Sequence, residues 1–261
     1  MVALAIEKEK NNKNPEVINR IHETEELLFH LADQVTATDK DKWNVIIGDD
    51  MGGRLPAHFI HDILKQDGRH LKTFFVASSK VYRDEKGSRP YQEYFQFIAE
   101  QLGEPMRPLI VTESVGTGNG IEFVKAELTP FCETPPEVAT VAVSEQSKDK
   151  VEYAGGIGEE AIGKVWHAYE SPPVISLGKR AIQKAWRTIV PESVRHKVRS
   201  KTFVRLVPPS INETVGIMSD LESDRPVAAV APQRNGALSH TAFSLMNEFA
   251  DEYHQRNSFS R

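Results

Sequence analysis

The chain has 261 residues, of which 39% are hydrophobic and 26% are charged, and its formal net charge is -5. This length allows one large domain, or one ordinary domain with an additional tail. The composition excludes a disordered polymer, and no apolar stretch approaches the roughly 20 residues that are needed to cross a bilayer. The single cysteine forms no intrachain disulfide and the N-terminus lacks a signal-peptide pattern, so we expect a soluble cytoplasmic protein without a membrane partner.

The first part of the chain alternates predicted helices and strands. Apolar residues at helical spacing indicate helices, and short continuous apolar runs indicate strands that are buried on both faces. In chain order, the predicted elements are a helix at 15–35, a strand at 43–47, a helix at 57–64, a strand at 71–77, a helix at 91–102, a strand at 109–111, a helix at 121–128 and a strand at 137–143. Each crossover between parallel strands places its helix on a face of the sheet. We therefore predict an α/β fold, a parallel sheet with helices on both faces, over residues 1–155.

The alternation ends near Lys150, and residues 156–261 are assigned to a C-terminal extension of helical or irregular structure. Within and just before it, short strands are expected at 151–154 and 227–230. Residues 242–253 predict a last amphipathic helix.

The stretch LIVTESVGTGNG, residues 109–120, places one carboxylate, Glu113, before a glycine-rich turn at residues 116–120, called the glycine turn below. In an open parallel sheet, ligands bind at the carboxyl ends of the strands, where helix N-termini point their amides outward. Glycines let the backbone wrap its amides around a phosphate, and a nearby carboxylate can accept hydrogen bonds from sugar hydroxyls. The pairing predicts a sugar-phosphate site, and an ordinary tight turn is the alternative. No dinucleotide or P-loop motif is present, which disfavours those sites.

The same stretch resembles the phosphoribosyl pyrophosphate (PRPP) signature of type I phosphoribosyltransferases. Two further segments are similar to that family in the family's order: IIGDDMGGRLPA to its pyrophosphate loop, and FFVASSKVYR to a strand and the start of its mobile loop. Together the three segments span roughly residues 40 to 145. The resemblance implies a Rossmann-like transferase of nucleotide metabolism. It would use PRPP and magnesium, and pass the phosphoribosyl group to a nitrogenous base or base-like acceptor with release of pyrophosphate.

The resemblance also implies roles for individual residues. Glu113, Lys80 and Arg54 would be catalytic, with Glu113 on the ribose hydroxyls. The PRPP-binding residues would be Thr112, Glu113, Ser114, Val115, Gly116, Thr117, Gly118, Asn119 and Gly120. The pyrophosphate-binding residues would be Asp50, Met51, Gly52, Gly53 and Arg54, and the mobile loop would contribute Ser78, Ser79, Lys80 and Arg83.

Two positions depart from the family's signature. Thr112 stands where the first of two acidic residues is expected, and Gly120 stands at the last hydroxyl position. Each missing charge-assisted hydrogen bond costs on the order of 1.5 to 3 kcal/mol. An alternative therefore stays open, a regulatory protein of the same fold that senses PRPP or a nucleotide without catalysis.

Residues 179–205 carry nine Lys or Arg residues against Glu192 alone. Three interpretations of this basic segment remain open: a helix with a solvated charged face, a surface that binds nucleic acid in the regulatory alternative, or a hood that presents cations to an anionic substrate. Charge alone does not separate them.

Four further polar residues and the cysteine have an ordinary interpretation beside a functional one. Asp49 and Asp50 follow a strand, where they can hold magnesium or form a solvated turn. His58 and His61 are three apart on a predicted helix and have no identifiable third ligand, so we expect a helix face rather than a metal site. Cys132 is expected to be structural. A homodimer through the apolar helices that flank the sheet is a further expectation.

Overall fold

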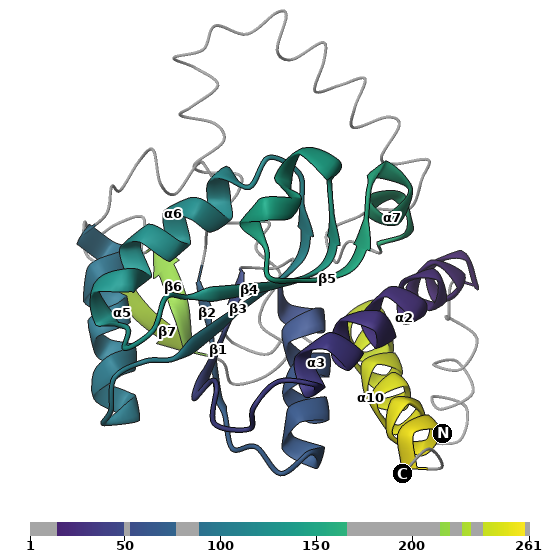
Figure 1. Ribbon diagram of the computed structural model, residues 1–261, viewed down its shortest axis with the longest axis horizontal. Helices are drawn as coiled ribbons and strands as arrows, with labels where there is room; N and C mark the ends of the chain where they lie inside the picture. The colour runs from purple at the N-terminus through teal and green to yellow at the C-terminus, as the bar shows by residue number, and fades with distance from the viewer. Residues whose placement is uncertain are drawn as a thin grey trace, which may run out of the picture.

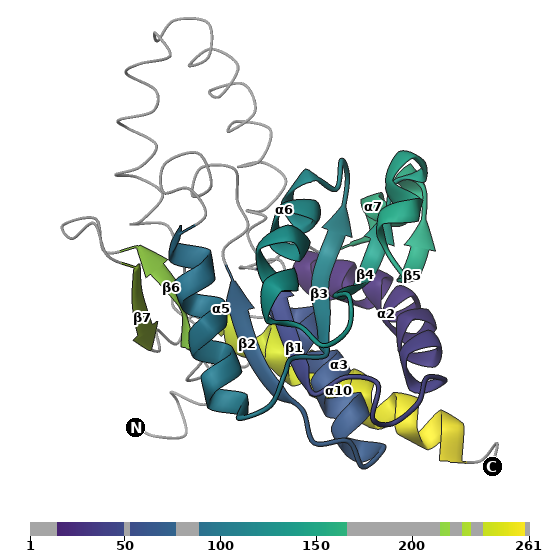
Figure 2. The same cartoon turned by 60° about the vertical axis from the view of Figure 1, so that its left-hand side comes forward.

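The computed structural model describes residues 15–49, 53–76, 89–165, 215–219, 226–230 and 237–258. In this part of the chain, helices cover both faces of one seven-stranded sheet (Figures 1 and 2). The strands are β1 (Val45–Asp49), β2 (Lys72–Val76), β3 (Pro108–Val115), β4 (Glu137–Val143), β5 (Tyr153–Ile157), β6 (Val215–Ser219) and β7 (Pro226–Val230). The helices are α2 (Pro15–Thr36), α3 (Arg54–Gln66), α5 (Arg89–Leu102), α6 (Asn119–Leu128), α7 (Glu159–Lys164) and α10 (Ala237–Ser258), with the short 3-10 helices η1 (Thr129–Phe131) and η2 (Glu145–Lys150).

The strand order is β5-β4-β3-β1-β2-β6-β7, and β1 to β5 are all parallel to their neighbours. β6 continues the parallel sheet beside β2, and β7 pairs antiparallel with β6. The predicted α/β fold with a parallel sheet is therefore confirmed. The chain moves outward from β1 to β2, and then returns to place β3 on the other side of β1. At such a reversal the loops after the two strands diverge and leave a crevice at their carboxyl ends.

The hydrophobic core has two parts, one on each face of the sheet. On one face, α2, α3 and α10 lie side by side and bury Leu31, Phe59 and Phe249 (Figures 1 and 2). On the other face, α5 and α6 bury Phe95 and Val124. Successive residues of β1, β2 and the first part of β3 alternate between the two parts, because side chains along a strand point to opposite faces. The core thus fixes the face on which each polar residue at the strand ends lies.

Helix α2 lies unusually close to the edge strand β5. A Cβ on Gly155 would collide with the carbonyl oxygen of Leu27 in α2 and would lie 2.7 Å from that of Val141. The side-chain amide of Gln34 bonds both backbone groups of Ala154, donating to its oxygen at 2.7 Å and accepting from its nitrogen at 3.3 Å. An open strand edge invites pairing with another chain, and Gln34 occupies this one.

Several element boundaries differ from the sequence-based prediction. β3 runs to Val115 instead of residue 111, because its polar end stays paired with β4, so Glu113 lies inside a strand. β5 begins at Tyr153, two residues later than predicted, and α10 begins at Ala237, five residues earlier. β6 was not predicted. The division of the chain at residue 155 stays a prediction.

None of the helices in the described ranges has both the length and the hydropathy of a segment that spans a bilayer. Three predicted features lie outside the described residues: most of the loop after β1 (residues 50–52), the proposed mobile loop (within 77–88) and the basic segment 179–205.

Candidate functional site

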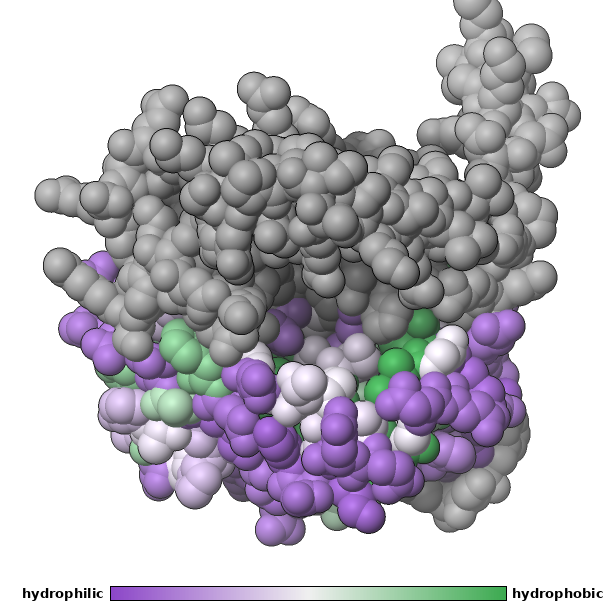
Figure 3. All heavy atoms as spheres, turned by 90° about the horizontal axis from the view of Figure 1, so that it is seen from above, coloured by the Kyte–Doolittle hydropathy of each residue, from purple (hydrophilic) through white to green (hydrophobic). Residues whose placement is uncertain are grey.

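The candidate site lies at the carboxyl ends of β1 and β3, where the strand order reverses. β2 and β3 point upward in Figure 2, and Figure 3 looks down on that edge of the molecule. Most of the described side chains that face the viewer there are hydrophilic, with a smaller group of hydrophobic ones.

Asp49 and Thr112 lie side by side at the ends of β1 and β3. The hydroxyl Oγ1 of Thr112 donates a hydrogen bond to Oδ2 of Asp49 over 3.2 Å. Thr112 is only 2% exposed. Ile47 and Ile110, two residues before each of them, pack on the α5 and α6 side, so strand alternation places Asp49 and Thr112 on that face. Thr112 thus orients the carboxylate of Asp49.

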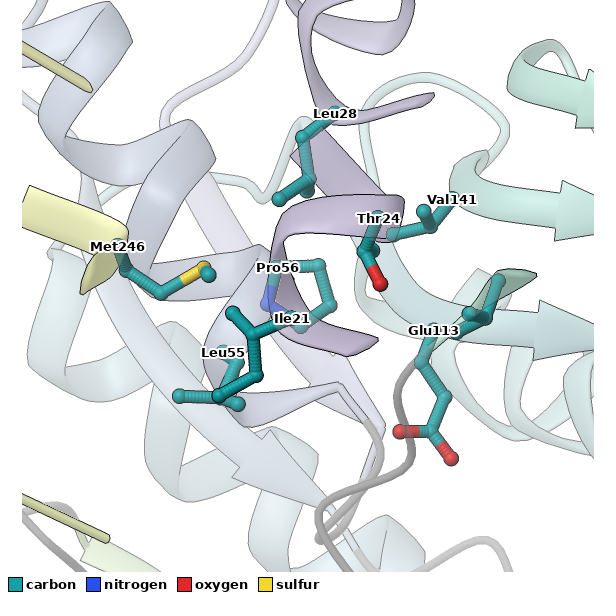
Figure 4. A pocket seen from close by; sticks show the side chains of 9 residues that line it. Ile21, Thr24, Leu28, Leu55, Pro56, Glu113, Val141 and Met246 are labelled. Atoms are coloured by element: carbon teal, nitrogen blue, oxygen red, sulfur yellow. The ribbon is translucent and has the colours of Figure 1, made fainter. Parts of the chain in front are cut away.

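Glu113 lies on the opposite face and is 5% exposed. With Ile21, Leu28 and Met246 among others, it lines a cavity of about 20 Å³. That volume holds about one water molecule, so the cavity itself does not accommodate a sugar. Figure 4 shows the Glu113 carboxylate pointing away from the apolar side chains. The acidic group therefore stands at the border of the apolar core.

The glycine turn is held from one side by the segment that follows β4. The carbonyl oxygen of Gly116 accepts hydrogen bonds from the hydroxyls of Ser144 at 2.5 Å and Ser147 at 2.7 Å. The carbonyl oxygen of Thr117 accepts one from Nζ of Lys150 at 2.9 Å. In a planar trans peptide, the N–H points opposite to the preceding C=O. The amides of Thr117 and Gly118 therefore point away from η2.

Gly118 and Gly116 differ in what the fold demands of them. Gly118 has φ 77 and stands at the N-cap of α6, and a Cβ there would collide with Lys150. Gly116 is exposed, and a Cβ on it would meet nothing within 4 Å. Packing thus requires the glycine at 118, while open space lies beside residue 116. The helix N-terminus after the turn carries a positive partial charge, which favours anions.

Gly53, the residue before α3, lies at the same strand ends. The amide of Gly53 donates to the carbonyl oxygen of Asp49 at 2.6 Å. A Cβ on Gly53 would collide with the backbone of both Asp49 and Val111, so Gly53 packs directly against β1 and β3. Arg54 follows as the first residue of α3, and its Cζ lies 5.6 Å from the centre of the Phe75 ring. Gly53 and Arg54 are therefore at the predicted edge of the sheet.

The remaining predicted site residues are not placed by the structure. Asp50, Met51 and Gly52 of the pyrophosphate loop, and Ser78, Ser79, Lys80 and Arg83 of the mobile loop, lie outside the described residues. Among the residues that are described, no three His, Cys, Asp or Glu side chains form a group that could hold a metal ion.

The two histidines of α3 contact different elements. Nε2 of His58 lies 3.0 Å from Oδ1 of Asn247 in α10, and Nδ1 of His61 lies 2.9 Å from Oγ1 of Thr73 in β2. Burial lowers the pKa of His61. These contacts connect α3 to its neighbours in the fold.

Cys132 is half-buried after η1. Its Sγ donates to the carbonyl oxygen of Leu128 at 3.1 Å, and burial raises the pKa of the thiol to about 12. A thiol with so high a pKa is a poor nucleophile at neutral pH, since the thiolate is the reactive form. The surroundings fit the structural role expected for it.

Sequence reasoning missed Ser144, Ser147 and Lys150, which hold the glycine turn. They were overlooked because 28 to 33 residues separate them from their partners in the turn. The sequence did contain a signal for these three residues. The polar segment after the strand at 137–143 must start at the carboxyl edge of the sheet, next to the loop that follows the neighbouring parallel strand.

No family model matches the chain, and no curated protein matches it either. Among solved structures, the chain is similar to a purine phosphoribosyltransferase from Pyrococcus horikoshii, with a TM-score of 0.35 and 22% sequence identity. The similarity covers 52% of this chain and 83% of that one.

Proposed function

We propose that this chain binds PRPP at the carboxyl ends of β1 and β3 and acts as a phosphoribosyltransferase. One observation supports this most strongly. Glu113 and the glycine turn belong to a single strand–turn–helix unit at the reversal of strand order, and the amides of Thr117 and Gly118 point away from the residues that hold the turn.

In this proposal, the glycine turn and the N-terminus of α6 bind the 5'-phosphate. Amides that converge on one point and the positive end of a helix both stabilise an anionic oxygen. Glu113 accepts hydrogen bonds from the ribose hydroxyls, because an ionised carboxylate is an acceptor with two oxygens. A sugar phosphate thus satisfies both parts of the site.

The proposed reaction exchanges one bond at the anomeric carbon of ribose. The bond from C1 to the pyrophosphate oxygen breaks, a bond from C1 to the acceptor nitrogen forms, and the acceptor nitrogen loses its proton. The protein must neutralise the leaving group, orient the acceptor and exclude water. Arg54 is the first residue of α3, and its guanidinium lies over the Phe75 ring. In this proposal it would neutralise negative charge on the leaving pyrophosphate. The proposal also assigns Lys80, Ser78, Ser79 and Arg83 to the mobile loop, which would close over the site.

Magnesium is the cofactor of this proposal. In phosphate sites, Mg²⁺ usually binds one or two carboxylates together with substrate oxygens and water. Asp49 offers one carboxylate, oriented by Thr112, and Asp50 follows it in the chain. These two residues would hold the ion, which when bound supplies positive charge to the leaving pyrophosphate.

A second candidate is a binding protein that senses PRPP or a nucleotide without catalysis. Thr112 favours it, because a threonine stands where the family's signature has a carboxylate near the ribose. Its hydroxyl is buried and bonded to Asp49. Nucleic-acid binding through residues 179–205 belongs to this candidate.

Calorimetric titration of the full chain with PRPP and magnesium tests both candidates. We expect saturable binding, and we expect Glu113→Ala to weaken it about tenfold or more, the usual effect of losing hydrogen bonds to a charged group. If titration of the intact chain gives no heat of binding, both candidate functions are wrong. If PRPP binds, release of pyrophosphate with a panel of nitrogenous bases identifies an enzyme, and no release with any base favours the sensor.

A further inference from the structure

Lys150, the last residue of η2, contacts the glycine turn and helix α6 in three ways. Its Nζ donates to the carbonyl oxygen of Thr117 at 2.9 Å, and it pairs with Oε1 of Glu122 at 3.0 Å. Its aliphatic carbons occupy the space where a side chain on Gly118 would lie. The lysine side chain is only 28% exposed. One side chain thus touches the turn, its positive-φ glycine and the first part of α6.

These contacts select one conformation of a flexible segment. A turn with three glycines has many accessible backbone conformations. Ser144 and Ser147 fix the carbonyl of Gly116, and Lys150 fixes the carbonyl of Thr117. Because each peptide is planar, fixing these two carbonyls also fixes the direction of the next two amides.

Lys150 also compensates a charge that opposes phosphate binding. Glu122 lies near the N-terminus of α6, and its side chain is 54% exposed. Its carboxylate repels an anion bound at that helix end, and the repulsion is twice as large for a dianion as for a monoanion. The ammonium group of Lys150, 3.0 Å away, cancels much of this charge.

We propose that Lys150 positions the glycine turn and sets its specificity for the dianionic form of a phosphate monoester. Lys150 directs the amides of Thr117 and Gly118 and neutralises Glu122, so that a doubly charged ligand is accepted beside that carboxylate. This inference rests on the proposed sugar-phosphate site and adds a residue and a ligand charge state to it.

Calorimetric titration of the full chain with ribose 5-phosphate tests the proposal. The second pKa of a phosphate monoester is about 6, so titrations at about pH 5 and about pH 7.5 compare monoanion and dianion. We expect Lys150→Met to weaken binding about tenfold at the higher pH, and clearly less at the lower one. Adding Glu122→Gln to Lys150→Met should restore part of the preference for the dianion, and Lys150→Arg should keep most of the affinity.

Lys148→Met is the matched control. Lys148 lies in the same η2 segment, is 58% exposed and pairs with Glu145 at 3.6 Å. Its replacement removes the same charge and should leave affinity unchanged. Thermal unfolding of each variant, and NMR order parameters of the Thr117 and Gly118 amides, report on folding and on turn rigidity. We expect the order parameters to fall in the variants that carry Lys150→Met and to be unchanged in Lys148→Met.

The outcomes separate this inference from the proposed function. If the intact chain binds neither PRPP with magnesium nor ribose 5-phosphate, the proposed function is wrong and this inference is wrong with it. If it binds PRPP but not ribose 5-phosphate, the inference alone is wrong. If it binds ribose 5-phosphate and Lys150→Met binds equally well at both pH values, the function stands and the inference alone is wrong. Equal weakening at both pH values that Glu122→Gln does not relieve would show a purely structural lysine and would also overturn the inference.

Discussion

Single residues at the strand ends differ sharply in their surroundings. The carboxylate of Asp49 is oriented by a buried threonine hydroxyl on the face of α5 and α6. Glu113 lies on the other face, at the border of an apolar cavity. Thr112 and Glu113 are neighbours in β3 and face opposite sides, so the carboxylates of Asp49 and Glu113 lie on different faces of the sheet. In the proposed function, Asp49 would serve the magnesium side and Glu113 the ribose.

The two glycines that open the turn provide a matched pair of substitutions. We expect Gly118→Ala to destabilise the protein by about 1 to 2 kcal/mol, the typical cost of a left-handed conformation for a residue with a Cβ. Gly116→Ala should leave stability nearly unchanged, because its Cβ meets nothing within 4 Å. Urea unfolding measures both. Equal stability losses would contradict the geometry of the turn.

The Cys132 thiol gives a pH-dependent expectation. Its pKa is raised from 9.0 to about 12 by burial, so the folded state holds its proton while the unfolded state loses it. The unfolded chain then binds fewer protons between these two values, and the contribution of this group to stability falls as pH rises from about 9 to about 12. Labelling with iodoacetamide should stay slow from pH 7 to about 9 in the native protein. A labelling rate that rises near pH 8.5, as it does for an exposed thiol, would contradict the raised pKa of Cys132.

At the scale of elements, the position of α2 against β5 depends on a glycine. Gly155→Ala would force a Cβ onto the backbone of α2, which does not yield as a flexible side chain does. We expect a loss of about 1 to 3 kcal/mol, as for overpacked sites. Gly163→Ala in α7 is the control, because a Cβ there meets nothing within 4 Å.

Denaturant unfolding compares the two variants. Replacing glycine by alanine in a helix stabilises it by up to about 1 kcal/mol, so Gly163→Ala should be neutral or more stable. A tolerated Gly155→Ala would mean that α2 and β5 are farther apart than described.

Across the whole molecule, apolar runs were sufficient to predict the first four strands, since each is buried on both faces. The end of β3 was missed because Thr112, Glu113 and Ser114 are polar, and only pairing with β4 keeps them in the strand. The glycine turn was found from its composition. Its supporting residues were not, because the adjacency of β3 and β4 brings Ser144, Ser147 and Lys150 to it from a distant part of the sequence. Sequence reasoning therefore locates the glycine turn better than the residues that hold it.

The central claim is that the amides of the glycine turn bind the phosphate of a ribose ester. NMR titration of the isotope-labelled full chain with PRPP and magnesium tests it most directly. We expect the amide resonances of Thr117 and Gly118 to shift and saturate together with those of residues near Glu113. Saturable shifts elsewhere in the chain, with these amides unchanged, would contradict it.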